Sequence, residues 1–434
     1  MQPPRGIERV VRDLMLGAVV GVLSGVGSYA FLRSLSWATD TRTEHGWLLF
    51  LLPFAGFAVG YAYLHFGGEA NRGTNLILDE LHDPTDAGPP LRMAPMVLIG
   101  STITHLFGGS SGREGAAVQI AASLTSLFRR FLAPSDRRAV IIAAVAGGFG
   151  SVFGVPAAGT VFAIEVPTVG RQRYEHLPAA LAAAFVGDRV TRGLGSHHHD
   201  YGRLTIDLDL ASMAAVAVAS IAFGWCAAVF IELTHIIRRR FSVHVRYSPL
   251  HPMLGGVVVI ALTGIVGTRS YLGLSLPLIN VALGGSAVVF AAFAWKLIFT
   301  SVTLGSGFPG GEVTPLFCMG ACLGSVLAGP LGLRSGALAG IGMVAVFAAA
   351  SNTPLACTLL GVELFPGTSP VVFLIATLIA TAMSGDRSVY GRQRIERSVR
   401  GGDAAHATMA EADAMRVDSW SRTARDLRAR GRRR

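Results

Sequence analysis

Two glutamates in glycine-rich stretches carry the residue types with the clearest chemistry. Glu114 lies in GGSSGREGAAVQ (residues 108–119), and Glu312 lies in GSGFPGGEVTP (residues 305–315). Glycines let the backbone turn tightly, and the first free N–H groups of a helix that starts there attract an anion. A carboxylate at the same place can compete with that anion and can carry a proton when it leaves. The two stretches therefore indicate anion transport coupled to protons.

The elements that must position these residues are membrane helices. Of the 434 residues, 51% are hydrophobic and only 15% are charged, whereas soluble domains average about a quarter charged residues. Nearly uncharged runs, several of them long enough to span a bilayer, cover residues 14–31, 47–66, 210–231 and 370–383. The first run has no clean cleavage site, so we expect a retained helix. The sequence predicts an integral membrane protein that crosses the bilayer several times.

Basic residues gather at the ends of the chain. The net charge is +10, and arginines precede the first apolar run and close the tail RTARDLRARGRRR. Nucleic-acid binding would explain a basic tail, but the positive-inside rule accounts for it better and places both termini in the cytoplasm. We therefore expect membrane lipid and no nucleic acid among the partners.

An internal repeat relates the two halves of the chain. Positions 198 residues apart often match, as for Glu114 with Glu312, Pro156 with Pro354, and Glu165 with Glu363. The matches predict a first transmembrane repeat in residues 1–195, a second in residues 204–392, and a basic cytoplasmic tail in residues 393–434. Apolar segments too short to span, such as residues 140–155 and 354–366, are typical of transporters with discontinuous helices, which bind substrate between the halves.

Three motifs, GGSSGREGAAVQ, GSGFPGGEVTP and SGDRSVYG (residues 384–391), resemble the anion-site segments of the CLC chloride channel and transporter family. The resemblance covers nearly the whole chain. It implies an all-α fold of two inverted repeats with about eighteen helical segments, and a homodimer with one pathway per subunit. It further implies that Glu114 is the gating glutamate, that Tyr390 coordinates the central anion, and that no metal, nucleotide or organic cofactor is needed.

Departures from the chloride-type motifs resemble the fluoride/proton antiporter branch of the family. RGTNLILDE (residues 72–80) stands where chloride-type members carry GSGIP, and Glu312 stands where an isoleucine is usual. Thr74 or Asn75 would take the first anion-binding position, and the alignment leaves both open. Fluoride is small and strongly hydrated, so its site should offer many donors. The expected anion-binding residues are Thr74, Asn75, Glu114, Gly115, Glu312, Val313, Thr314 and Tyr390.

The function implied is export of fluoride in exchange for protons across the cytoplasmic membrane of a prokaryote, with a chloride/proton antiporter or chloride channel as the alternative. Val166 stands where chloride/proton exchangers often carry an internal proton acceptor. We therefore expect protons to reach Glu114 by a path that uses Glu312 or water. An enzyme is not expected, because the apolar segments hold neither a nucleophile with its base nor a ligand cluster such as HExxH.

Several polar residues have simpler interpretations. For Thr314, helix capping or bonding back to its own helix competes evenly with anion binding. Lys296, the only lysine, is expected to snorkel to an interface, with binding of a passing ion as the alternative. Arg113 is expected to pair elsewhere than with Glu114, because neighbours in a helix do not face each other. Glu165 and Glu363 are expected to be helix caps or salt-bridge partners.

Overall fold

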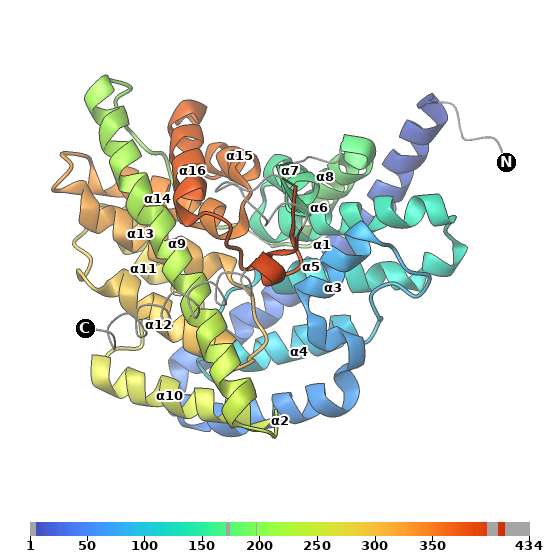
Figure 1. The fold of residues 1–434 in the computed structure, drawn as a ribbon, viewed down its shortest axis with the longest axis horizontal. Coiled ribbons are helices and arrows are strands. Elements are labelled where there is room, and N and C mark those ends of the chain that lie inside the picture. The colour runs from blue at the N-terminus through green and yellow to red at the C-terminus, as the bar shows by residue number, and fades with distance from the viewer. Residues whose placement is uncertain (1–5, 171–173, 197, 397–406, 413–434) are drawn as a thin grey trace, which may run out of the picture.

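The computed structural model describes residues 6–170, 174–196, 198–396 and 407–412. Most of the basic tail predicted for residues 393–434 lies outside these ranges. Within them the chain is mostly helical, and its strands are limited to one short parallel pair, β1 (Thr168–Val169) and β2 (Arg394–Ile395). Figure 1 shows the helices packed side by side in one body.

Sixteen α-helices form within the described residues, eight in each half. The first eight are α1 (Gly6–Glu44), α2 (Leu52–Ala62), α3 (Thr74–His82), α4 (Met93–Leu106), α5 (Glu114–Leu124), α6 (Arg137–Phe153), α7 (Pro156–Glu165) and α8 (Leu177–Gly193). The second eight are α9 (Leu210–His244), α10 (Leu250–Val266), α11 (Leu276–Leu283), α12 (Ala292–Gly305), α13 (Val313–Ala328), α14 (Ser335–Ser351), α15 (Pro354–Leu364) and α16 (Pro370–Ser384).

Helices of the second half repeat those of the first at the spacing found in the sequence. The pairs α2 and α10, α6 and α14, and α7 and α15 each begin 198 residues apart. The count of sixteen described α-helices is slightly below the predicted eighteen or so, and short turns of other helical types join α2 to α3 in one stretch, Gly46–His82. The all-α fold of two repeats is confirmed.

Three described helical stretches are long and apolar enough to cross a bilayer: Gly6–Glu44, Gly46–His82 and Leu210–His244. Most other apolar helices have 10–17 residues, shorter than the ~20 that a full span requires. The prediction of short, interrupted membrane segments is therefore confirmed. Their ends lie inside the protein, where each needs polar partners.

Glu165 and Glu363 provide such partners to each other's repeat. The Glu165 carboxylate, at the end of α7, accepts the N–H groups of Leu355 at 3.1 Å and Ala356 at 2.7 Å, which begin α15. The Glu363 carboxylate, near the end of α15, accepts those of Ala157 at 3.0 Å and Ala158 at 2.7 Å, which begin α7. The prediction that these glutamates are helix caps is confirmed. Each cap joins one repeat to the other, and α7 and α15 lie side by side (Figure 1).

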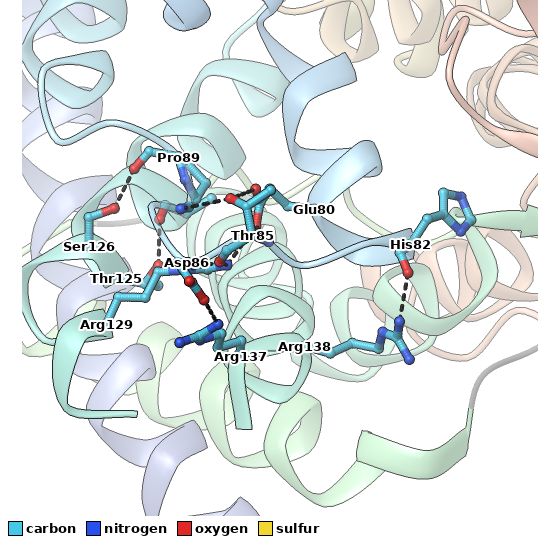
Figure 2. Close-up of polar contacts among 12 residues, drawn as sticks. Glu80, His82, Thr85, Asp86, Pro89, Thr125, Ser126, Arg129, Arg137 and Arg138 are labelled. Carbon is cyan, nitrogen blue, oxygen red and sulfur yellow. Dashed lines mark hydrogen bonds and ion pairs between the residues drawn. The ribbon is translucent and has the colours of Figure 1, made fainter. Parts of the chain in front are cut away.

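A buried ion pair fixes α3, the helix that begins with Thr74 and Asn75. Arg129 Nη2 donates to Glu80 Oε2 at 2.6 Å, and both side chains are almost fully buried. The same Glu80 oxygen accepts the backbone N–H of Thr85 at 3.1 Å, and Arg138 reaches the His82 carbonyl at 2.6 Å (Figure 2). These contacts tie the end of α3 to the segment between α5 and α6.

Candidate functional site

The two glycine-rich turns meet where α5 and α13 begin. Gly112 N donates to Gly311 O at 2.6 Å, and Gly311 N donates to Gly112 O at 2.9 Å. A Cβ on Gly311 would lie 3.0 Å from the backbone nitrogens of Glu114 and Gly115, so only glycine permits this contact. The turns therefore bring the N-termini of two helices, one from each repeat, to a common point.

The Glu114 carboxylate occupies that point and is fully buried. Its Oε2 accepts the backbone N–H groups of Arg113 and Thr314, each at 3.1 Å. Its Oε1 accepts the Thr314 hydroxyl and Arg113 Nε, the latter at 3.3 Å. Four donors around one carboxylate form an anion-binding arrangement, and the residue that fills it belongs to the protein itself.

Thr314 and Arg113 differ from what helix rules alone suggest. The Thr314 hydroxyl neither caps its helix nor bonds back to it, because it donates to Glu114. The expectation that Arg113 pairs away from Glu114 is wrong. Arg113 is the N-cap of α5, with φ −119° and ψ −24°, so it precedes the helix, and the rule for neighbours within a helix does not apply.

A small cavity of about 20 Å³ lies beside the carboxylate. Polar groups on its wall come from Thr74, Glu114 and Tyr390, and the starts of α5 and α13 contribute Gly115 and Val313. The rest of the wall is apolar: Ile77, Leu78, Val118, Val145, Phe149, Phe162 and Val166. A cavity of this size holds about one water-sized particle. Val166, which stands where chloride/proton exchangers often carry an internal proton acceptor, thus lines the cavity.

Glu312 stands next to this cavity. Its Oε2 is buried and has no hydrogen-bond partner among the described residues. A Cβ on Gly115 would lie 3.2 Å from that oxygen and 3.7 Å from Thr74 Oγ1, so both side chains border the same backbone face. Glu312 also lines a larger opening of about 710 Å³, named the Glu312 vestibule here.

Thr74 and Asn75 occupy different places. Thr74 lines both the small cavity and the Glu312 vestibule, and its hydroxyl accepts Gln119 Nε2 at 3.0 Å. Asn75 lines only the vestibule, and its Oδ1 accepts the N–H of Arg392 at 3.1 Å. Gln119 was not among the residues expected at the site, although it lies only five residues after Glu114 in GREGAAVQ. The Thr74 hydroxyl accepts from Gln119 and can donate its own hydrogen to another acceptor.

Lys296 is not at an interface, so the prediction that it snorkels is wrong. The side chain is fully buried, and Nζ donates to the hydroxyls of Ser110 and Ser275, each at 2.9 Å, and to the Gly273 carbonyl at 2.7 Å. Hydrophobicity alone could not reveal these partners, because they are serine hydroxyls and backbone carbonyls of two loops. Lys296 joins α12 to the first glycine-rich turn and to the segment before α11.

A second large opening, of about 1130 Å³, lies on another side of Glu114 and is named the Arg113 vestibule. Its wall includes Arg42, Arg113 and Arg269. The Glu312 vestibule is also basic, with Arg72, Arg238 and Arg392 on its wall. Arginine-lined openings concentrate anions by their electric field. Both were missed in the sequence, where these arginines are scattered.

Comparisons with known proteins show which sequences resemble this chain. A family model described as voltage gated chloride channel matches residues 55–385. A chloride/fluoride channel protein of Pseudomonas syringae pv. tomato is 43% identical over 404 residues, which cover 90% of this chain and 88% of that protein. An H(+)/Cl(-) exchange transporter of Yersinia pestis is 27% identical over 421 residues, covering 86% and 85%.

Solved structures share the fold. The crystal structure of a CLC-type fluoride/proton antiporter superposes with a TM-score of 0.86 at 29% identity, covering 91% of this chain and 100% of that one. A slow cyanobacterial Cl-/H+ antiporter has the same fold at a TM-score of 0.72 and 18% identity, covering 88% and 95%. The arrangement of helices is thus that of known anion/proton antiporters.

Proposed function

Because the chain belongs to the voltage-gated chloride channel family, which includes the CLC antiporters, we propose that it exports fluoride from a prokaryotic cytoplasm in exchange for protons. The observation that carries this proposal is the Glu114 carboxylate held by four donors between two helix N-termini, with the unpaired Glu312 Oε2 beside the same cavity. One side chain competes with the anion, and a second carboxyl group stands close enough to exchange a proton or to donate to the anion.

The cycle alternates Glu114 between two states. Ionised, its carboxylate occupies the donors of Arg113 and Thr314, and the anion is excluded. Protonated, it loses most of its attraction to these donors, leaves them, and carries its proton to the Arg113 or the Glu312 vestibule. The anion then takes the vacated donors. Because the same donors serve anion and carboxylate in turn, movement of one requires movement of the other.

Fluoride is the substrate that the site supports best. The cavity of about 20 Å³ suits a water-sized ion. The hydroxyls of Thr74 and Tyr390 and the N–H groups that begin α5 and α13 provide donors, and a protonated Glu312 adds one more. The names of two similar proteins, a chloride/fluoride channel protein and a fluoride/proton antiporter, support the same choice. The alternative is a chloride/proton exchanger or a chloride channel, as the similar Yersinia transporter suggests.

Liposomes loaded with equal concentrations of fluoride and chloride decide between these substrates. With purified protein in the membrane, ion-selective electrodes follow the two anions in one sample. We expect fluoride efflux at least about tenfold faster than chloride efflux, because the small cavity with its several donors favours the smaller, more strongly hydrated anion. Faster chloride efflux would exclude the fluoride proposal and favour the alternative. Protein-free liposomes control for leak.

The arrangement in the membrane belongs to the same proposal. Both termini lie in the cytoplasm, residues 1–195 and 204–392 are the two repeats, and residues 393–434 are a basic cytoplasmic tail. Two copies associate, each with its own pathway. Exposed apolar side chains on α8 and α16, among them Leu181, Phe185, Leu378 and Met383, offer a surface for the second copy, since these helices flank the joined pair α7 and α15.

A further inference from the structure

Two arginines on the wall of the Arg113 vestibule lack partners. The guanidinium groups of Arg42, near the end of α1, and of Arg269, just after α10, make no hydrogen bond or ion pair in the part of the chain that the structure describes. Arg42 Nε is buried without an acceptor. The two guanidinium groups are close enough to repel each other electrostatically. Two like charges at short range repel each other, and an anion between them offsets that repulsion.

Two glycines leave space for this pair beside the backbone. A Cβ on Gly46 would lie 1.7 Å from Arg269 Nη1, and a Cβ on Gly273 would lie 3.0 Å from Arg42 Nη2. Any side chain at Gly46 would displace the guanidinium group. The absence of side chains at Gly46 and Gly273 leaves room for both cations, and two guanidinium forks on the wall of one opening offer a set of donors for an anion.

A third cation, the Lys296 ammonium group, contacts the same loop as Arg42. Lys296 Nζ donates to the carbonyl of Gly273, the residue against which Arg42 packs, and its acceptors are carbonyls and hydroxyls without negative charge. Asp40 is the one carboxylate among the residues that line this vestibule, and its Oδ2 accepts the Ser36 hydroxyl at 3.5 Å. The positive charge around Gly273 is thus left uncompensated.

We propose that Arg42 and Arg269, backed by Lys296, form a binding site for a small inorganic anion in the Arg113 vestibule. This site is a station for the transported ion on the far side of Glu114. Its role in transport rests on the proposed function. Arg113 lines the same vestibule and contacts the Glu114 carboxylate, so it connects the station to the gate.

The length of α1 places this station on the side of the membrane opposite to the N-terminus. The helix has 39 residues, or about 58 Å at 1.5 Å per residue, whereas the hydrocarbon core is about 30 Å thick. Arg42 near its end is therefore across the bilayer from residue 6. With the termini in the cytoplasm, the station receives exported fluoride before release.

Crystals of the full-length protein soaked in bromide test binding directly. We expect an anomalous peak between the guanidinium groups of Arg42 and Arg269 in the wild-type protein, and no such peak in Arg42→Gln or Arg269→Gln. Absence of the peak from wild-type crystals overturns the site. This result is independent of the transported ion, so it stands even if the fluoride proposal fails.

Exchange kinetics test the role in transport. The fluoride concentration on the vestibule side that gives half-maximal exchange should rise about fivefold in either variant, because one nearby charge is lost. Arg33→Gln is the matched control, since Arg33 lines the same vestibule, is exposed and lies outside the pair. Arg269 is exposed, so Arg269→Gln provides a folded variant if Arg42→Gln does not fold.

Two outcomes contradict the station. If the bromide peak is present but the half-maximal concentration is unchanged in Arg42→Gln and Arg269→Gln, the pair holds an adventitious ion only. If Arg33→Gln raises the half-maximal fluoride concentration equally, the electric field of the whole vestibule explains the effect, and Arg42 and Arg269 do not form a specific site. In both cases the wild-type protein still exchanges fluoride for protons, so the proposed function is left standing.

Discussion

Glu312 shows how one residue can change the chemistry of a shared scaffold. It is the N-cap of α13, its Oε2 has no partner among the described residues, and it borders the same backbone face as Thr74. A carboxyl group there can donate to an anion when protonated and repel it when ionised. Isoleucine, the usual residue of chloride-type members, can do neither.

Glu312→Gln tests that role. Glutamine keeps the shape and a donor but cannot transfer a proton, so we expect coupled exchange to slow by at least about tenfold while the protein stays folded. The rate of coupled exchange is measured from the fluoride and proton fluxes of one liposome sample. Glu8→Gln, an exposed change in the first turn of α1, is the control. Fully coupled exchange at the wild-type rate would remove Glu312 from the proton path.

Residue types and spacing identify Glu114 and Glu312 as candidates, because ionisable groups beside glycine-rich turns are rare in membrane segments. Tyr390 was expected only from the resemblance to the CLC family. Their partners are harder to predict. Lys296 binds carbonyls, which leave no signal in a sequence, and Arg113 folds back onto Glu114 because it precedes the helix. Such contacts depend on tertiary structure.

At the scale of elements, the reciprocal caps between α7 and α15 join the two repeats. Each helix is shorter than a span, so its first N–H groups are buried and need an acceptor. The sequence indicated that Glu165 and Glu363 end matching helices. It could not show that each carboxylate reaches the other helix, because that requires the two repeats to be placed relative to each other.

Glu165→Gln and Glu363→Gln should each destabilise the protein. A neutral amide offers a weaker acceptor to the N–H pairs, and loss of charge-assisted hydrogen bonds costs about 1–3 kcal/mol. We expect a lower midpoint of thermal unfolding in detergent at a fixed heating rate, with an unchanged fluoride-to-proton ratio. Glu8→Gln serves again as the control. An unchanged midpoint in both variants would argue against the caps.

At the scale of the whole molecule, the repeat was the strongest sequence signal. The spacing of 198 residues predicted the helix pairs α6 with α14 and α7 with α15, which begin at that spacing in the structure. The meeting of the two glycine-rich turns through Gly112 and Gly311 follows from the same symmetry. The vestibules could not be predicted, since their arginines come from segments without any shared motif.

The proposed homodimer gives a prediction at this scale. We expect the purified protein to have twice the 45.5 kDa of one chain by light scattering with correction for detergent. The double variant Leu181→Lys, Leu378→Lys should be monomeric, because two charged side chains cannot be buried between the copies. Val257→Lys is the control, because Val257 is about as exposed as these leucines. It belongs to α10, which lies at the opposite edge of the molecule from α8 and α16 (Figure 1). A wild-type protein of single-chain mass would contradict the dimer.

The most direct test of the central claim is simultaneous recording of fluoride and protons in liposomes that contain the wild-type protein or Glu114→Gln. If Glu114 alternates between the anion site and a protonated state, wild-type fluoride efflux drives protons inward without an applied proton gradient. Glu114→Gln then abolishes proton movement, whatever fluoride flux remains. Proton uptake that continues in Glu114→Gln at the wild-type ratio to fluoride would contradict the account.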